Sequence, residues 1–401
     1  GVSNRVVVVG ISLFFGLIGL FLCRVVTLFF IGYMRGLNEH AQTRYYFCFA
    51  VAIFGAVGVA FSGNVLTLYL FYEVITVYLM GTSKLFLLPA MVLTYVLCGT
   101  LDFHLGDIVT GMPFPWKEHP GLVTLTYVLY IAGMAKAALM PFHNWLPSAM
   151  VAPTPVSALL HAVAVVKAGV FCVARVVLSG FGVTIMDGLN LGLTTAYLAA
   201  FTIVVASIIA LTKDDLKARL AYSTVSQLSY VVIGVCMLTP MAVQGGVMHI
   251  AHHAFSKITL FMGAGAIYAT AHLKKISLMD GLGRRMPITF TAFSVAALSM
   301  IGVPFVCGFV TKWYLVNGAI QAKEAVLIIA LLGSTILNAS YFGPIIYRAL
   351  FKPAAEGAHL DHYGEPAPAL VIPLVVTSII SVVLGIYPEI FLGFARTFGG
   401  Y

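Results

Sequence analysis

Residues 128–155 read VLYIAGMAKAALMPFHNWLPSAMVAPTP, an apolar run that four prolines and one lysine interrupt. The run is long enough to enter a bilayer. Proline removes a helical hydrogen bond and its ring clashes with the preceding turn, so the four prolines cannot all belong to one regular helix. The stretch therefore predicts a discontinuous membrane helix that breaks near Pro141–Pro147, with Lys136 just before the break.

The composition of the whole chain is that of a membrane protein. Of 401 residues, 61% are hydrophobic and only 9% are charged, whereas soluble domains carry about 25% charged residues. Lipid cannot satisfy backbone N–H and C=O groups, and the alternating pattern of a membrane barrel is absent, so the spans are expected to be helices. We predict an all-α polytopic membrane protein that forms one membrane domain over residues 1–401. The twelve predicted spans are 10–34, 44–62, 64–81, 84–101, 121–141, 155–178, 193–212, 223–239, 243–271, 287–318, 325–350 and 369–395.

A second interrupted segment lies in the other half of the chain. Residues 287–318 are too long for one simple span and carry Gly302, Pro304 and Gly308 near their middle. Two interrupted hydrophobic segments, one in each half, are typical of transporters built from inverted repeats with ion sites near the membrane midplane. We expect the second break at Pro304–Gly308.

The basic residues predict the orientation of the chain. When the twelve spans are threaded alternately, one side receives nearly all Lys and Arg residues of the loops, and the other receives mainly Lys117 and Lys323. The positive-inside rule places the basic side in the cytoplasm of the cell (inner) membrane, with both termini outside. The net charge of +8 thus arises from loops that face a lipid surface, and nucleic acid is not an expected partner. The residues of the basic side are Arg35, Arg44, Lys84, Lys213, Lys217, Arg219, Lys274, Lys275, Arg284, Arg285, Arg348 and Lys352.

The six cysteines do not point to a cofactor. Most lie within apolar runs and none forms a CxxC pair, so neither a disulfide framework nor an iron–sulfur or zinc site is supported. We expect no cofactor and no metal in this subunit, and any electron transfer to take place in partner proteins.

Five charged residues fall inside apolar runs: Glu73, Lys136, Lys167, Lys257 and Lys312. A charge at mid-membrane is costly, so such residues are rare and usually functional. Burial disfavours the charged form of lysine, whereas a nearby carboxylate favours it. A buried lysine beside a mobile carboxylate is therefore suited to taking up and releasing a proton.

Histidines extend this set. His249, His253 and Lys257 are spaced by four residues, which places them on one stripe of a helix, and histidine titrates near neutral pH. His161 lies six residues before Lys167 and is a supporting candidate, although it could equally be a structural histidine. The same alternative holds for His143, and His252 faces away from the stripe, which favours a structural role. Lys84 and Lys352 lie near the ends of spans, where lysine side chains extend to the membrane surface.

Four ordered motifs resemble the antiporter-like family of proton-conducting membrane subunits. The family includes the large antiporter-like subunits of respiratory complex I, the D-type subunit of Mrp Na⁺/H⁺ antiporters and relatives in membrane-bound hydrogenases. The resemblance covers nearly the whole chain. The motifs are GMAKAALMPFHNWLPSAMVAPTPVSALLHAVAVVKAG (133–169), LTKDDLKARLAYSTVSQLSY (211–230), HIAHHAFSKITLF (249–261) and GVPFVCGFVTKWYL (302–315).

The resemblance implies a fold and a set of partners. It implies two inverted five-helix repeats, at about 44–178 and 193–350, each with one discontinuous helix marked here by Pro141 and Pro304, and a C-terminal helix at 369–395. It also implies other membrane subunits as partners, including antiporter-like paralogues, and a peripheral redox module in some assemblies. The subunit would itself be a non-redox, ion-translocating part of a complex I-like translocase or an Mrp-type antiporter.

The resemblance also implies a role for each buried charge. Glu73 would pair with Lys136 of the broken helix, and Lys167 would be the next lysine inward. The central residues would be His249, His253 and Lys257, and the terminal one Lys312. A proton would enter from the cytoplasm at Lys167 and the central histidines, and Lys257 and Lys312 would pass it outside, with water bridging the longer gaps.

Two other functions are open at this stage. One is a stand-alone secondary transporter for a solute, coupled to H⁺ or Na⁺, which would need specific polar groups at the helix breaks. The other is a redox enzyme, for which no haem, quinone or iron–sulfur motif is present. Exchange of Na⁺ for H⁺ is a variant of the antiporter-like function that the residues do not decide.

The spacing of two spans is unusual. Residues 64–101 provide two spans with almost no polar loop between them, and the family's first two helices have no counterpart here. We therefore expect either unusually tight turns or residues missing from the sequence near 9–10 and 77–82.

Overall fold

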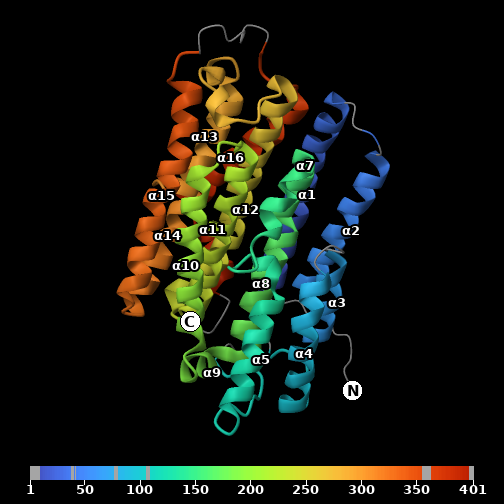
Figure 1. Ribbon diagram of the computed structural model, residues 1–401, viewed down its shortest axis with the longest axis vertical. Coiled ribbons are helices and arrows are strands. Elements are labelled where there is room, and N and C mark those ends of the chain that lie inside the picture. The colour runs from blue at the N-terminus through green and yellow to red at the C-terminus, as the bar shows by residue number, and fades with distance from the viewer. Residues whose placement is uncertain are drawn as a thin grey trace.

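A computed structural model describes residues 10–37, 40, 42–75, 80–104, 109–354 and 363–396. Within these residues the chain forms helices joined by short loops, and only two isolated β-bridges occur. The long helices run roughly side by side (Figure 1). Six helices of the described part are long and apolar enough to cross a membrane. The predicted all-α fold is confirmed, and the chain is a multi-pass membrane protein.

The first half of the chain is divided into many pieces. They are α1 (Gly10–Gly36), α2 (Gln42–Ala60), α3 (Val65–Ile75), α4 (Met80–Cys98), α5 (Pro120–Gly133), η1 (Ala135–Ala137), α6 (Trp145–Ser148), η2 (Ala149–Val151), α7 (Thr154–Ala158), η3 (Leu159–Val163), α8 (Val165–Arg175), η4 (Val176–Phe181) and α9 (Gly182–Gly188).

Longer helices make up the second half. They are α10 (Leu191–Thr212), α11 (Leu216–Cys236), α12 (Pro240–Ala271), η5 (Ile276–Leu278), η6 (Leu282–Arg284), α13 (Pro287–Ile301), α14 (Cys307–Gln321), α15 (Ala325–Leu350), α16 (Pro368–Ile386) and α17 (Glu389–Arg396). The longest helix, α12, has 32 residues and contacts α11, α13, α14 and α16, so its side chains are almost all buried.

The first break is present but begins earlier than its prolines predict. Helix α5 ends at Gly133, and a single 3₁₀ turn over 135–137 follows, so the predicted span 121–141 is too long. Close packing explains this position. A Cβ on Gly169 of α8 would lie 2.5 Å from the backbone N of Ala137 and 2.5 Å from the backbone C of Lys136. Helix α8 therefore lies directly against the backbone that carries Lys136.

The second break lies where it is predicted. Helix α13 ends at Ile301 and α14 begins at Cys307, so no helix runs through residues 295–315. Gly302 ends α13 with a φ of +91°, a conformation that L side chains rarely adopt. Two discontinuous helices are thus present, one in each half.

The predicted span 155–178 is also subdivided. It comprises α7, a π-helical turn (η3), α8 and a second π-helical turn (η4). π-Helical turns inside helices are rare and often occur at functional sites. His161 lies in the first turn, and Lys167 follows in the first turns of α8.

Two other predicted spans differ from the observed helices. Helix α3 has 11 residues, which rise about 16 Å and do not cross a bilayer, so the predicted span 64–81 is not one described helix. The predicted C-terminal helix 369–395 is two helices, because α16 ends before Pro388 and α17 packs the Phe391 ring against Phe14. The predicted gaps near 9–10 and 77–82 concern Val9 and 76–79, which lie outside the described residues. The repeat boundaries 44–178 and 193–350 stay a prediction.

Candidate proton-relay site

The seven predicted relay residues are buried. Glu73 is the most accessible with 9% of its surface exposed, and Lys312 follows with 8%. The other five are at most 1% exposed; they are Lys136, Lys167, His249, His253 and Lys257. Titratable groups buried in this way are costly unless they are paired or hydrated, which makes the cluster a candidate site.

Lys136 lies in the single 3₁₀ turn of the first break and faces Tyr72 of α3. Its Nζ donates to the Tyr72 backbone carbonyl and lies 3.5 Å from the centroid of the Tyr72 ring. Its backbone N–H donates to the Tyr72 hydroxyl at 3.2 Å. The break exposes backbone groups, and Tyr72 both satisfies one of them and holds the lysine against α3.

The predicted ion pair between Glu73 and Lys136 is not formed as a direct contact. Within the described residues, the Lys136 Nζ donates to the backbone carbonyl of Tyr72, the residue before Glu73, and not to the Glu73 carboxylate. The two charges are nevertheless near enough to attract each other.

The closest contact of the predicted relay joins Lys167 to His253. The Lys167 Nζ lies 2.6 Å from the His253 Nδ1, and both side chains are fully buried. This distance lies within the range over which a proton can pass directly between two groups. Helix α8 supplies the lysine and α12 the histidine, so the contact links the two halves of the chain.

From His253 a line of side chains continues to Lys312. The His253 and His249 ring centroids are 5.8 Å apart, and the His249 ring centroid is 5.4 Å from that of Tyr230 on α11. The Lys312 Nζ lies 5.3 Å from the Tyr230 ring centroid. A second polar group, the Gln227 Oε1, lies 3.1 Å from the His249 Nε2.

Lys257 lies beside this line. Its Nζ donates to the Ser223 hydroxyl of α11. The same Nζ lies 5.9 Å from the Phe261 ring centroid and 5.8 Å from the Phe342 ring centroid. The predicted stripe is confirmed, because Lys257 and His249 both face α11 from an unbroken α12. The predicted passage from Lys257 to Lys312 has no direct contact among the described residues, whereas His249 reaches Lys312 through Tyr230.

Lys312 is held by the second break. Its Nζ donates to the Ile301 carbonyl at 2.6 Å and to the Thr335 hydroxyl at 3.1 Å. The Ile301 carbonyl belongs to the last residue of α13, whose helical hydrogen bonding the break interrupts. A Cβ on Gly302 would lie 2.6 Å from the Lys312 Cδ, so this glycine also leaves space for the lysine.

Two further buried histidines, His252 and His161, differ in their contacts. The His252 Nδ1 lies 2.8 Å from the Thr311 hydroxyl on α14, so His252 does face away from the stripe. His161 is fully buried, and within the described residues neither of its ring nitrogens has a hydrogen-bond partner. Its ring centroid lies 4.8 Å from that of Phe261 in a tilted arrangement, and Phe261 also lies beside Lys257.

Sequence reasoning missed several polar residues of the site. Gln227 and Tyr230 lie within the quoted motif 211–230, but their contacts depend on how α11 faces α12. Arg175 is 2% exposed and donates to the Ser62 carbonyl at 2.6 Å. It lies near the end of the predicted span 155–178, where charged side chains commonly reach the membrane surface. Arg24 is an exposed charge midway along α1, a signal that the apolar run itself contains.

The described residues contain no group of three or more His, Cys, Asp or Glu that could hold a metal ion. The expected absence of a cofactor stays a prediction. What the site offers chemically is a succession of proton donors and acceptors, with Lys136 and Lys167 not joined by a hydrogen bond among the described residues. Bridging that gap requires water.

Comparison with known proteins agrees with this geometry. Residues 73–338 match the family described as NADH:quinone oxidoreductase/Mrp antiporter, TM. The chain belongs to this family. The matched range begins at Glu73 and includes every other candidate relay residue.

Individual relatives are about one third identical to the chain over the aligned residues. The NADH-quinone oxidoreductase subunit N of Desulforudis audaxviator is 32% identical over 394 residues, covering 89% of this chain and 77% of that protein. The NADH-ubiquinone oxidoreductase chain 5 of Cryptococcus neoformans is 34% identical over 292 residues, covering 71% of this chain. The chain spans only 43% of that second relative.

A solved structure shows the same fold. A chain of the Mrp complex from a Dietzia species superposes with a TM-score of 0.81 at 19% identity, covering 96% of this chain and 82% of that chain. At this identity the likeness concerns the fold alone.

Proposed function

We propose that this chain is a proton-translocating membrane subunit of a multi-subunit energy-converting complex. The observation that carries the proposal is the buried line Lys167–His253–His249–Tyr230–Lys312, which connects the two discontinuous halves. A single solute site would gather its polar groups at one cavity, whereas these groups extend from α8 across α12 and α11 to Lys312 after the second break. Membership in the antiporter-like family supports the same function.

Protons move along this line by short transfers. A protonated Lys167 donates to the His253 Nδ1 across 2.6 Å, and water between the histidines and Lys312 completes the path. Lys136 is the controlling group, because the Glu73 carboxylate favours its charged form when the two approach. Movement of α3, which carries Glu73, would change that distance and release the proton.

Partner subunits and orientation complete the proposal. The relatives named above are subunits of NADH–quinone and NADH–ubiquinone oxidoreductases. Arg24 is exposed midway along α1, and a charge there is costly in lipid, so a neighbouring membrane subunit is expected to cover it. The basic loops lie in the cytoplasm, and the first and last described helices begin and end on the opposite side.

The test is proton pumping by the reconstituted complex in vesicles. Lys136→Arg should abolish pumping, because arginine keeps its charge and does not release its proton in the working range. Lys136→Ala should abolish it as well, with the subunit content of the complex unchanged. Pumping by Lys136→Arg at the wild-type rate would show that Lys136 is only a fixed charge, and the proposed mechanism would be wrong.

A further inference from the structure

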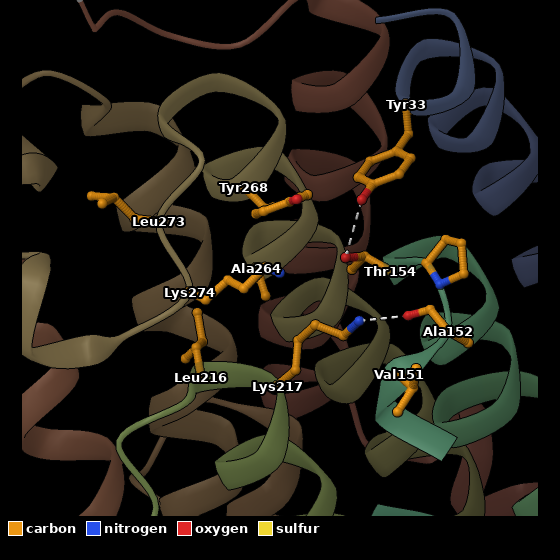
Figure 2. A pocket seen from close by; sticks show the side chains of 11 residues that line it. Tyr33, Val151, Ala152, Thr154, Leu216, Lys217, Ala264, Tyr268, Leu273 and Lys274 are labelled. Carbon is orange, nitrogen blue, oxygen red and sulfur yellow. Dashed lines mark hydrogen bonds between the residues drawn. The ribbon is translucent and has the colours of Figure 1, made fainter. Parts of the chain in front are cut away.

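A small pocket lies beside the discontinuous segment, away from the relay. Its volume is about 190 Å³. Four parts of the chain form it: the end of α1, the segment that leads into α7, the start of α11 and the end of α12 with its following loop (Figure 2). The lining residues on which the argument rests are Tyr33, Val151, Ala152, Lys217, Tyr268 and Lys274.

The pocket is positively charged. Lys217 and Lys274 line it, and no aspartate or glutamate is among its described lining residues. The nearest carboxylate in sequence, Asp215, accepts from the Ala218 N–H at 2.8 Å as the N-cap of α11. Two ammonium groups therefore face one small volume without a carboxylate in it.

The lysine ammonium groups in the pocket keep N–H donors that are free for a bound ligand. The Lys217 Nζ donates to the Ala152 carbonyl at 2.6 Å, which leaves two of its three N–H bonds for another acceptor. The Lys274 Nζ lies 5.1 Å from the Tyr268 ring centroid. In Figure 2, Tyr33 and Lys217 approach the 152–154 segment from two sides of the same space.

The place of the pocket suits a lipid headgroup. It lies where α1 and α12 end and where basic residues gather, and tyrosines such as Tyr33 and Tyr268 are typical of that depth in a membrane. Val151 beside it is 95% exposed, so one apolar side chain next to the pocket is available to an acyl chain. A phosphodiester between these lysines with its acyl chains along Val151 would match both surfaces.

We propose that this pocket binds a phosphate group, presented by the headgroup of an anionic membrane lipid or free in solution. The bound anion would neutralise Lys217 and Lys274 together and tie the 152–154 segment to α11 and α12. None of the seven relay residues lines the pocket, so the proposal does not depend on proton translocation.

The experiment uses the full chain in lipid nanodiscs and native mass spectrometry. In discs of mixed phosphatidylglycerol and phosphatidylcholine, the wild type should retain phosphatidylglycerol. Lys274→Gln should lower retention about fivefold, and Lys217→Gln with Lys274→Gln about 25-fold, because each substitution removes one of the two ammonium groups that would contact the phosphate in the pocket. Lys275→Gln is the matched control, since it removes the same charge from a neighbouring exposed residue that does not line the pocket, and it should leave retention unchanged.

A second arm separates the two sources of phosphate. Equilibrium dialysis of radioactive inorganic phosphate against the chain in pure phosphatidylcholine discs measures free phosphate binding. Binding there that Lys274→Gln weakens, without a preference for phosphatidylglycerol, would assign the pocket to free phosphate. Equal retention by wild type and both variants, with no phosphate bound, would overturn the proposal. Lys274→Gln keeps the Lys217–Ala152 hydrogen bond, so its result does not depend on refolding of the segment.

Discussion

At the scale of single residues, backbone carbonyls hold two lysines of the site, one carbonyl in α3 and one at the end of α13. Lys136 binds the Tyr72 carbonyl and Lys312 binds the Ile301 carbonyl. A carbonyl binds an ammonium group but, unlike a carboxylate, carries no net charge to hold the proton there. Both lysines are therefore held in place by neutral acceptors, without a direct ion pair among the described residues.

Glu73→Gln tests the indirect relation of Glu73 to Lys136. Pumping should fall strongly, because the amide no longer attracts the charged form of Lys136. Stability should change by less than about 1 kcal/mol, since the carboxylate forms no direct ion pair with Lys136 within the described residues. Glu118→Gln, an exposed carboxylate, is the control for the pumping assay. A large loss of stability in Glu73→Gln, measured by thermal unfolding in detergent, would indicate a direct ion pair instead.

At the scale of secondary-structure elements, the discontinuities of the two halves are built differently. The second break is short and contains the glycine and the proline that predict it. The first break begins at Met134, before any proline. The difference arises from α8, whose Gly169 lies against the backbone of Lys136 and Ala137. Packing between elements, rather than the prolines alone, sets where the first helix ends.

Gly169→Ala should show the cost of that packing. The added Cβ would meet backbone atoms that cannot move independently, so we expect a loss of about 1–3 kcal/mol and reduced pumping as Lys136 is displaced. Gly333→Ala in α15 is the matched control, because nothing lies within 4 Å of its Cβ. That control should gain up to about 1 kcal/mol from the helix propensity of alanine. Equal unfolding temperatures for the two variants would contradict the close packing.

At the scale of the whole molecule, the relay connects elements from both halves through one central helix. On helix α12, His253 contacts Lys167 of α8, and His249 lies beside Tyr230 of α11 (Figure 1). A shift of α12 would change both contacts together. The ends of the bundle have different charge, and the basic end carries the pocket with Lys217 and Lys274.

The proposed orientation can be measured with single cysteines. Cys48 is exposed and would first be replaced by serine. In that background, Lys275→Cys should react with a membrane-impermeant maleimide only from the cytoplasmic side, and Lys117→Cys only from the outer side, because both positions are exposed in loops at opposite ends. Right-side-out and inside-out vesicles supply the two sides. Labelling in the reverse pattern would invert the orientation.

The sequence by itself determined the membrane class, the two interruptions and the seven buried relay candidates, although it missed the buried Arg175. Apolar runs, prolines and isolated lysines have local energetic consequences in lipid, so they can be interpreted without knowing what packs against them. Only the tertiary structure decided which group each lysine contacts. Lys136 meets the Tyr72 carbonyl rather than Glu73, and Tyr230 rather than Lys257 lies next to Lys312. Those contacts depend on how α3, α8, α11 and α12 rotate and approach one another, and this is fixed by close packing of many side chains across the bundle.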